Sequence, residues 1–124
     1  RDGYGVKRLL AAGIEVAIIS GRDSAAVAAR MAALGVRHVF QGRDDKLPVL
    51  EALLGKLGVA PEHTAFVGDD EPDIPPMKAV ALAITVADGH PAVRAASHWV
   101  TQSGGGRGAV REVAEFLLAS RSCD

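Results

Sequence analysis

The sequence predicts an α/β fold, with a doubly wound, mostly parallel sheet and helices on both of its faces. Short apolar runs alternate along the chain with longer stretches whose apolar residues recur at helical spacing, and this alternation is typical of βαβ units. Aromatic residues make up only 4% of the chain although 48% of it is hydrophobic, so Ala, Val and Leu must fill a layered core. The 124 residues suffice for one domain, which we expect to span 1–124.

The individual elements follow from these two periodicities. The first helix is expected to end at Gly13, because glycine tolerates the left-handed conformation that closes many helices. The next run is apolar except for Glu15, as in a strand buried on both faces. A later helix carries leucines at i, i+3, i+4 and i+7, namely Leu50, Leu53, Leu54 and Leu57. The expected strands are 14–19, 38–40, 64–67, 81–86 and 98–101, and the expected helices are 2–12, 24–34, 46–57 and 108–120, with a short helix before the last strand.

Composition and charge argue against several classes of partner. The net charge is −1, so no overall field would attract nucleic acid or an anionic membrane. No run approaches the roughly 20 apolar residues that a membrane-spanning helix needs. The single cysteine, Cys123, cannot form an internal disulfide, which is compatible with a reducing cytoplasm. We therefore expect a cytoplasmic protein that binds neither nucleic acid nor membranes.

An acidic loop follows the strand expected at 64–67. Asp69, Asp70 and Asp73 repel one another unless a cation or water separates them, and Mg²⁺ prefers one or two carboxylates beside phosphate oxygens. Asp69 directly follows the strand and is the best candidate ligand, while Asp70 and Asp73 could hold metal-bound water or orient the loop. An acidic helix start favoured by the helix dipole is the alternative interpretation.

Two further polar residues fall where ligands collect in parallel sheets, beyond the carboxyl ends of strands. Ser20 follows the strand 14–19 and could donate to a phosphate oxygen from its hydroxyl and its backbone N–H, with Gly21 allowing close approach. The alternative interpretation is that Ser20 caps a helix. Lys46 begins the helix after the second strand and could neutralise phosphate, although an isolated lysine is most often solvated. Each signal is weak alone, and their order on successive strand ends is the stronger observation.

In this order, Ser20-Gly21-Arg22, Lys46, and Gly68-Asp69-Asp70 with Asp73 resemble the second, third and fourth motifs of the haloacid dehalogenase (HAD) superfamily of phosphatases. A narrower resemblance, to HAD phosphatases that act on 3-deoxy-D-manno-octulosonate 8-phosphate, covers nearly the whole chain. It is carried by five stretches, Arg1 to Gly5, Ile18 to Arg22, Gln41 to Lys46, Gly68 to Met77, and Gly105 to Glu112. The resemblance implies a HAD-like (Rossmann-like) hydrolase domain without a separate cap domain.

The same resemblance implies a Mg²⁺-dependent phosphatase of lipopolysaccharide precursor synthesis that works through an aspartyl-phosphate. Ser20 would hold the phosphate, Lys46 would neutralise it as part of the substrate site, and Asp69 would bind Mg²⁺. Contacts to the sugar-phosphate substrate are implied for a further set, Arg1, Asp2, Gly3, Lys7, Gly21, Arg22 and Arg30. Arg107 or Arg111 beside the glycine run 104–106 would be available to a sugar carboxylate, although the run also fits a flexible loop. A homotetramer is implied by the family alone.

The chain departs from the family pattern at its start. The attacking aspartate belongs to a D-x-D motif on a strand upstream of the R-D-G stretch, and no D-x-D occurs among these residues. We expect the domain to be N-terminally incomplete, so that the nucleophile and a β-hairpin that helps to build the tetramer lie before Arg1. The chain alone should then be inactive.

Two other functions stay open. The short motifs do not separate this substrate from the 9-phosphate of a nine-carbon sugar acid, and a non-catalytic HAD-like assembly domain of a cytidylyltransferase would also lack the nucleophile. The order of residues argues against a response-regulator receiver, whose acidic pair comes first and whose lysine comes late. Trp99 is expected in the core and Met77 beneath the acidic loop. The histidines show no metal-ligand spacing and are expected to be structural: His38, His63, His90 and His98.

Overall fold

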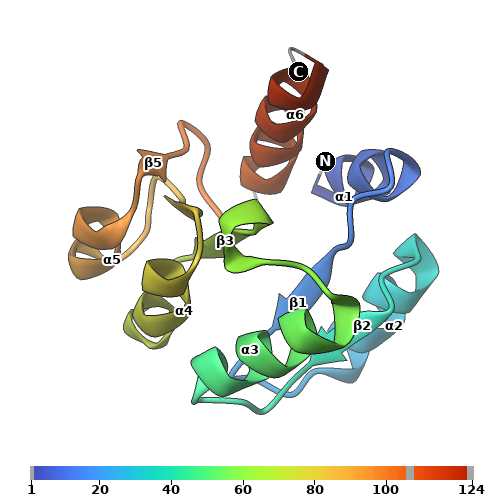
Figure 1. Ribbon diagram of the computed structural model, residues 1–124, viewed down its shortest axis with the longest axis horizontal. Helices are drawn as coiled ribbons and strands as arrows, with labels where there is room; N and C mark the ends of the chain where they lie inside the picture. Colours follow the sequence, from blue (N-terminus) through green and yellow to red (C-terminus); the bar gives the residue numbers. More distant parts are fainter. Residues whose placement is uncertain (1, 106–107, 123–124) are drawn as a thin grey trace.

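The computed structural model describes residues 2–105 and 108–122, with side chains as far as residue 120. Its strands are β1 Ala17–Ile19, β2 His38–Phe40, β3 Ala65–Gly68, β4 Leu82–Thr85 and β5 Trp99–Val100. Its α-helices are α1 Asp2–Ala11, α2 Ala25–Leu34, α3 Lys46–Leu57, α4 Ile74–Ala79, α5 Pro91–Ala96 and α6 Ala109–Ser122, and two 3₁₀ turns are η1 Pro61–His63 and η2 Glu71–Asp73. Strands and helices alternate through most of the chain, as expected for an α/β fold (Figure 1).

The element boundaries follow local chemistry. Ser24 caps α2 by accepting a hydrogen bond from the backbone N–H of Val27, and Gly35 closes the helix with a φ of 93°. The strand β1 is shorter than expected because Ile14 donates its N–H to the carbonyl of Leu9, which makes it part of the turn that ends α1. Sequence periodicity located the strands and the longer helices, but it did not predict α4 or the two 3₁₀ turns. Local hydrogen bonds such as these fix the ends of the elements.

All strand pairs among the described residues are parallel, but they form two sheets rather than the single sheet that the sequence suggested. One sheet pairs β1 with β2, and the other has the order β3-β4-β5. Thus β1 and β3 are both edge strands, and no described strand pairs with either of them on the second side. Val67 in β3 is 39% exposed, which is unusual for a parallel strand, because such strands are normally buried on both faces.

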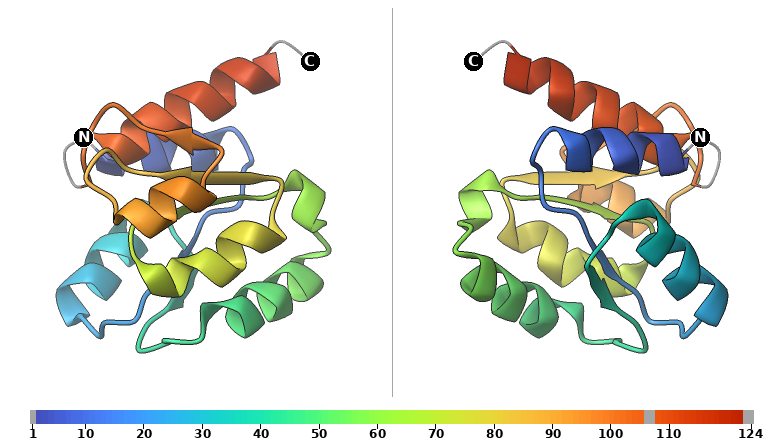
Figure 2. Two further views of the ribbon diagram at one scale, coloured as in Figure 1. Left: turned by 90° about the vertical axis from the view of Figure 1, so that its left-hand side faces the viewer. Right: turned by 90° about the vertical axis from the view of Figure 1, so that its right-hand side faces the viewer.

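Helix α3 joins the two sheets. Leu50 and Leu54 of this helix form a buried cluster with Val80, and Ile19 of β1 and Phe66 of β3 pack against the same cluster. The two edge strands therefore rest on one helix and belong to one layer of the fold. Figure 2 shows this strand layer between α1 and α6 on one side and α3 and α4 on the other.

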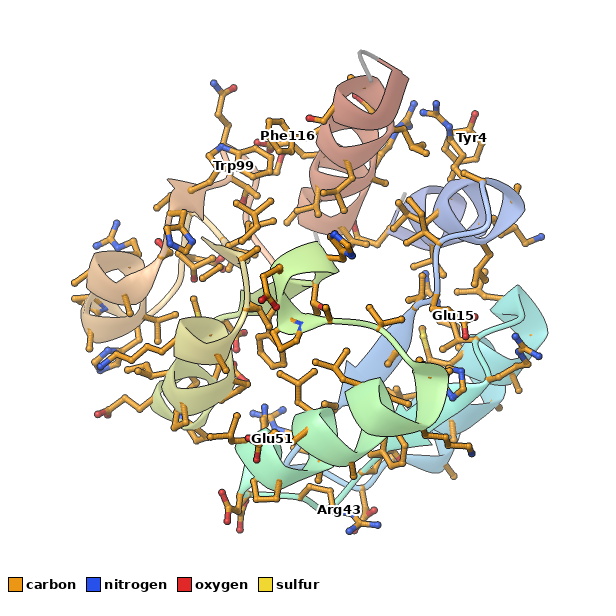
Figure 3. The ribbon with its side chains drawn as sticks, in the orientation of Figure 1. Tyr4, Glu15, Arg43, Glu51, Trp99 and Phe116 are labelled. Carbon is orange, nitrogen blue, oxygen red and sulfur yellow. The ribbon has the colours of Figure 1, made fainter. Side chains whose placement is uncertain are left out.

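A second cluster lies beneath the loop that follows β3. Met77 and Val93 are fully buried there with Ala83, in agreement with the position expected for Met77. The expectation that Trp99 lies in the core is wrong, because this residue is only half-buried. Its ring contacts Phe116, itself 44% exposed, at a centroid separation of 4.7 Å, and the pair lies on the side of α6 away from Tyr4 (Figure 3).

Helices α1 and α6 cross closely because Gly5 has no side chain. A Cβ added at Gly5 would lie 2.8 Å from the Cα of Arg111. At the same crossing, the carboxylate of Asp2 accepts hydrogen bonds from the backbone N–H groups of Val110 (3.2 Å) and Arg111 (3.4 Å). Asp2 therefore caps α6 from a residue more than one hundred positions away in the sequence. No described helix is both long and apolar enough to cross a membrane.

Gly5→Ala should destabilise the protein by about 1–3 kcal/mol, because the added methyl group meets backbone atoms that cannot rotate away. Urea unfolding would measure the change. The matched control is Gly55→Ala on α3, where a Cβ would meet nothing within 4 Å and helix propensity predicts a gain of up to about 1 kcal/mol. Equal effects of the two substitutions would contradict the close packing of α1 on α6.

Candidate active site

The candidate site lies at the carboxyl ends of the strands. Ser20 follows β1, and Lys46 begins α3 after the loop that leaves β2. The acidic loop leaves β3 at Gly68. Parallel pairing within each sheet puts its strand ends at one edge, and α3 holds the two sheets together. The residues that the sequence predicts to bind phosphate and metal are therefore brought to the same edge of the strand layer, where the strands end.

Asp73 is the centre of this site. It is 4% exposed, and one of its carboxylate oxygens accepts a hydrogen bond of 2.6 Å from the Nζ of Lys46. Its other oxygen accepts from the backbone N–H of Asp69 at 3.0 Å and of Asp70 at 3.3 Å. Both oxygens are thus used within the site, so Asp73 ties the lysine and the acidic loop to each other.

Gly68 makes room for this arrangement. A Cβ added at Gly68 would overlap with the Cβ of Asp73, so a residue with a side chain does not fit at this position. The loop then continues through η2, where Asp70 accepts a hydrogen bond from the N–H of Glu71 at 2.8 Å. Pro75 and Pro76 fall at the start of α4, where a missing N–H costs no intrahelical bond. The acidic loop is therefore held by local contacts before any ligand arrives.

Asp69 is the carboxylate that these contacts leave available. Partial desolvation, followed by repulsion from Asp73, raises the pKa of Asp69, and the nearby Lys46 opposes this only in part. A bound cation would favour the charged form of Asp69. Among the residues that the structure describes, no group of three or more His, Cys, Asp or Glu side chains could hold a metal. Asp69 fits Mg²⁺ as one protein ligand, with phosphate and water as the others.

Ser20 does not cap a helix, since Ser24 performs that role for α2. The backbone N–H of Ser20 donates to the carbonyl of Phe40, so it is not available to a phosphate. The hydroxyl oxygen of Ser20 accepts from the N–H of Arg22 at 3.2 Å. Because that lone pair is occupied, the hydroxyl hydrogen points elsewhere and can be donated to an anion.

The remaining predicted substrate contacts are spread over a wider area. Arg30 lies close to Gly3, about 3.6 Å from where a Cβ would stand, so α1 and α2 bring these two together. Gly21, Arg22 and Lys7 are exposed, and Asp2 serves as the cap of α6 described above. Arg1 and Arg107 lie outside the described residues.

Arg111 is engaged at the helix surface. Its Nε bonds Glu115 at 3.1 Å, and its guanidinium lies 5.0 Å from the centre of the Tyr4 ring. Three histidines have structural partners: His98 accepts from the N–H of Ala83, His90 caps α5, and His38 pairs with Glu15. These contacts agree with the structural role expected for them.

Sequence reasoning did not single out Asp88. It lies in the loop after β4 and accepts a hydrogen bond of 2.9 Å from the N–H of Gly105. Position after a parallel strand, which Ser20 and Asp69 share, applies equally to Asp88. Gly68 belongs to the acidic motif, but its contact with Asp73 has no signal in the sequence.

The comparisons with known proteins identify the class. A family model described as haloacid dehalogenase-like hydrolase matches residues 5–81, and the chain belongs to this family. It is 49% identical over 121 residues to the 3-deoxy-D-manno-octulosonate 8-phosphate phosphatase of Escherichia coli K12, a match that covers 98% of this chain and 64% of that protein. The chain thus spans somewhat less than two thirds of the length of this curated relative.

Two solved structures are similar throughout. The phosphatase of the same description from Yersinia pestis superimposes with a TM-score of 0.96 at 44% identity, covering 98% of this chain and 65% of that one. The phosphatase from Moraxella catarrhalis, determined with a magnesium ion, a phosphate ion and a KDO molecule, gives a TM-score of 0.93 at 45% identity, covering 95% and 68%. The HAD-like α/β fold expected from the sequence is confirmed.

The Lys46–Asp73 pair should contribute far more to the free energy of unfolding than a surface ion pair does. Asp73→Ala should lower the free energy of unfolding by about 3 kcal/mol, because it leaves a largely buried ammonium without a partner, and combining it with Lys46→Met should recover part of that loss. Urea unfolding of both single variants and the double variant gives the coupling energy. Glu115→Ala, which breaks the exposed pair with Arg111, is the control and should cost less than about 1 kcal/mol. Similar losses for the two alanine variants would contradict the central role of Asp73.

Asp69→Asn should maintain or raise the stability of the metal-free protein at pH 7. The folded-state pKa of Asp69 is raised, so its charged form opposes folding above that pKa, and the penalty fades as the pH falls through it. The asparagine variant should lack this contribution to the pH dependence when unfolding is measured in EDTA at pH 7 and pH 5. Added Mg²⁺ should raise the Tm of the original protein by mass action and leave that of the variant unchanged. A large loss of metal-free stability on substitution would show that Asp69 has a structural role instead.

Proposed function

We propose that this chain forms most of a Mg²⁺-dependent phosphatase that hydrolyses 3-deoxy-D-manno-octulosonate 8-phosphate. The observation that carries the proposal is the convergence of a hydroxyl donor, a lysine and an available carboxylate at one edge of a HAD-like fold. The names of the similar proteins support the substrate, and the magnesium and phosphate ions in the Moraxella catarrhalis structure support the cofactor and the reaction class.

The proposed roles follow from the contacts. Lys46 donates one of its three ammonium hydrogens to Asp73 and keeps two for the phosphate oxygens. The Ser20 hydroxyl donates to another phosphate oxygen, while its own oxygen accepts from the backbone N–H of Arg22. Both groups are held by the protein before the substrate binds, which is the condition under which such donors stabilise a transition state.

Asp69 would hold the Mg²⁺, and Asp73 would keep its backbone in place through the N–H groups of Asp69 and Asp70. When bound, the ion would supply positive charge to the phosphoryl group and orient it for in-line attack. Asp73 is a poor ligand in this proposal, because both of its oxygens already accept hydrogen bonds from the protein.

We propose further that the nucleophilic aspartate belongs to a strand outside these 124 residues that adds between β1 and β3. Both are edge strands in their sheets, and both rest on α3 through Ile19 and Phe66. The 39% exposure of Val67 is consistent with a neighbour on that side of β3. A parallel strand in this position would end between Ser20 and Asp69, where an aspartate could attack a phosphate held by both. The hydrolysis would then proceed through an aspartyl-phosphate, and a homotetramer in the cytoplasm is part of the same proposal.

The test uses a protein of the same length as the relatives, purified and assayed for phosphate release. We expect Mg²⁺-dependent turnover of the octulosonate 8-phosphate that exceeds turnover of a nine-carbon sugar acid 9-phosphate, and loss of turnover in EDTA. Lys46→Ala should reduce kcat/KM by roughly 10²-fold or more, as expected for a lost charged donor in the transition state. Preference for the nine-carbon substrate would correct the specificity. Absence of turnover with both at millimolar Mg²⁺ would refute the proposal.

A further inference from the structure

We propose that Asp88 is a positioning residue whose carboxylate fixes the segment 101–105 as one wall of the site that receives the sugar-acid part of the substrate. The inference rests on the proposed function, and it concerns how the substrate is held rather than how its phosphate reacts. It begins from the topology. Because β3, β4 and β5 are parallel neighbours, the acidic loop, the loop 86–90 and the segment 101–105 all leave the sheet at one edge.

The loop 86–90 is bonded to both of its neighbours at this edge. On one side the N–H of His90 donates to the carbonyl of Asp69 at 3.0 Å. On the other side the N–H of Ala87 donates to the carbonyl of Ser103 at 3.3 Å, and Asp88 accepts from the N–H of Gly105 at 2.9 Å. The backbone of residues 87–90, with a hydrogen bond at each end, thus connects the candidate metal ligand to the segment 101–105.

The two halves of that segment are held differently. Residues at its start are tied by contacts that do not involve Asp88: the N–H of Gln102 (2.9 Å) and that of Ser103 (3.0 Å) donate to the Glu112 carboxylate, and Thr101 donates its N–H to the carbonyl of Thr85 at 2.9 Å. Gly105, by contrast, is held by Asp88. Loss of the Asp88 carboxylate should therefore release residues 104–105 without opening the base of the segment.

The glycines suit both the clamp and a ligand. A Cβ on Gly104 would lie 3.2 Å from an oxygen of Asp88, so the absence of a side chain allows the carboxylate to approach. Gly105 is also exposed, so no side chain of its own separates its backbone from a polyhydroxylated molecule. The segment 101–105 leaves the sheet at the same edge as Asp69 and is connected to it through residues 87–90. A substrate whose phosphate lies near Asp69 therefore meets this segment when its sugar extends toward β5.

The test compares two substrates in a protein of the same length as the relatives. Asp88→Ala should raise KM for the sugar-acid phosphate about tenfold, as for a lost hydrogen bond to a charged group, with less than a threefold change in kcat. KM for p-nitrophenyl phosphate, which has no sugar acid, should stay the same. Asp88→Asn keeps an acceptor oxygen and should restore most of the affinity. Glu62→Ala, which removes an exposed acid before the opposite end of β3, should change neither KM.

Amide hydrogen exchange provides a readout independent of turnover. Exchange at Gly105, whose N–H donates to Asp88, should become at least fivefold faster in Asp88→Ala, while Gln102 and Ser103 should keep their protection. If the unsubstituted protein has no phosphatase activity, the proposed function is refuted. The role of Asp88 is then decided by the exchange rates together with direct binding of the free sugar acid. Unchanged exchange, or equal rises in KM for both substrates, would overturn this inference.

Discussion

The carboxylate of Asp73 is the constraint on which the site depends. It is nearly buried and sits between an ammonium on α3 and two backbone N–H groups of the acidic loop. A buried carboxylate is stable only when it is paired and hydrogen-bonded, so the positions of Lys46 and the loop are coupled rather than set separately. The room for Asp73 in turn depends on the missing side chain of Gly68. One glycine, one aspartate and one lysine from two segments thus determine where the available acid, Asp69, is presented.

The same coupling explains how the acids divide their roles. Three aspartates within five positions would repel one another in open solution, yet here each has a different environment. Asp73 is neutralised by Lys46, Asp70 faces solvent and caps η2, and Asp69 carries the raised pKa. Burial and the repulsion from Asp73 thus disfavour the charged form of Asp69. A cation bound beside Asp69 would offset this penalty, because a nearby positive charge favours the charged form of a carboxyl group.

Much of this arrangement could be predicted from the sequence, and the limits have physical reasons. Position after a parallel strand was enough to bring Ser20 and Asp69 to one edge, because the rule depends only on strand direction. The partner of Asp73 could not be predicted, since several acids and lysines have suitable spacing and only the fold selects one. The division into two sheets also has no signal, because an apolar run such as 14–19 is the same whether or not a neighbour is present. Trp99 does not lie in the core as expected, because β5 is an edge strand and the Trp99 ring packs on the half-exposed ring of Phe116 in α6.

The cap that Asp2 provides for α6 has a consequence for the order of folding. A helix capped from within its own segment can complete its first turn early, but the donors at Val110 and Arg111 await a carboxylate 108 and 109 residues away. The loop closed by that contact spans more than one hundred residues, and its entropic cost is met only after the intervening layers have assembled. The docking of α6 on α1 is therefore a late event in folding.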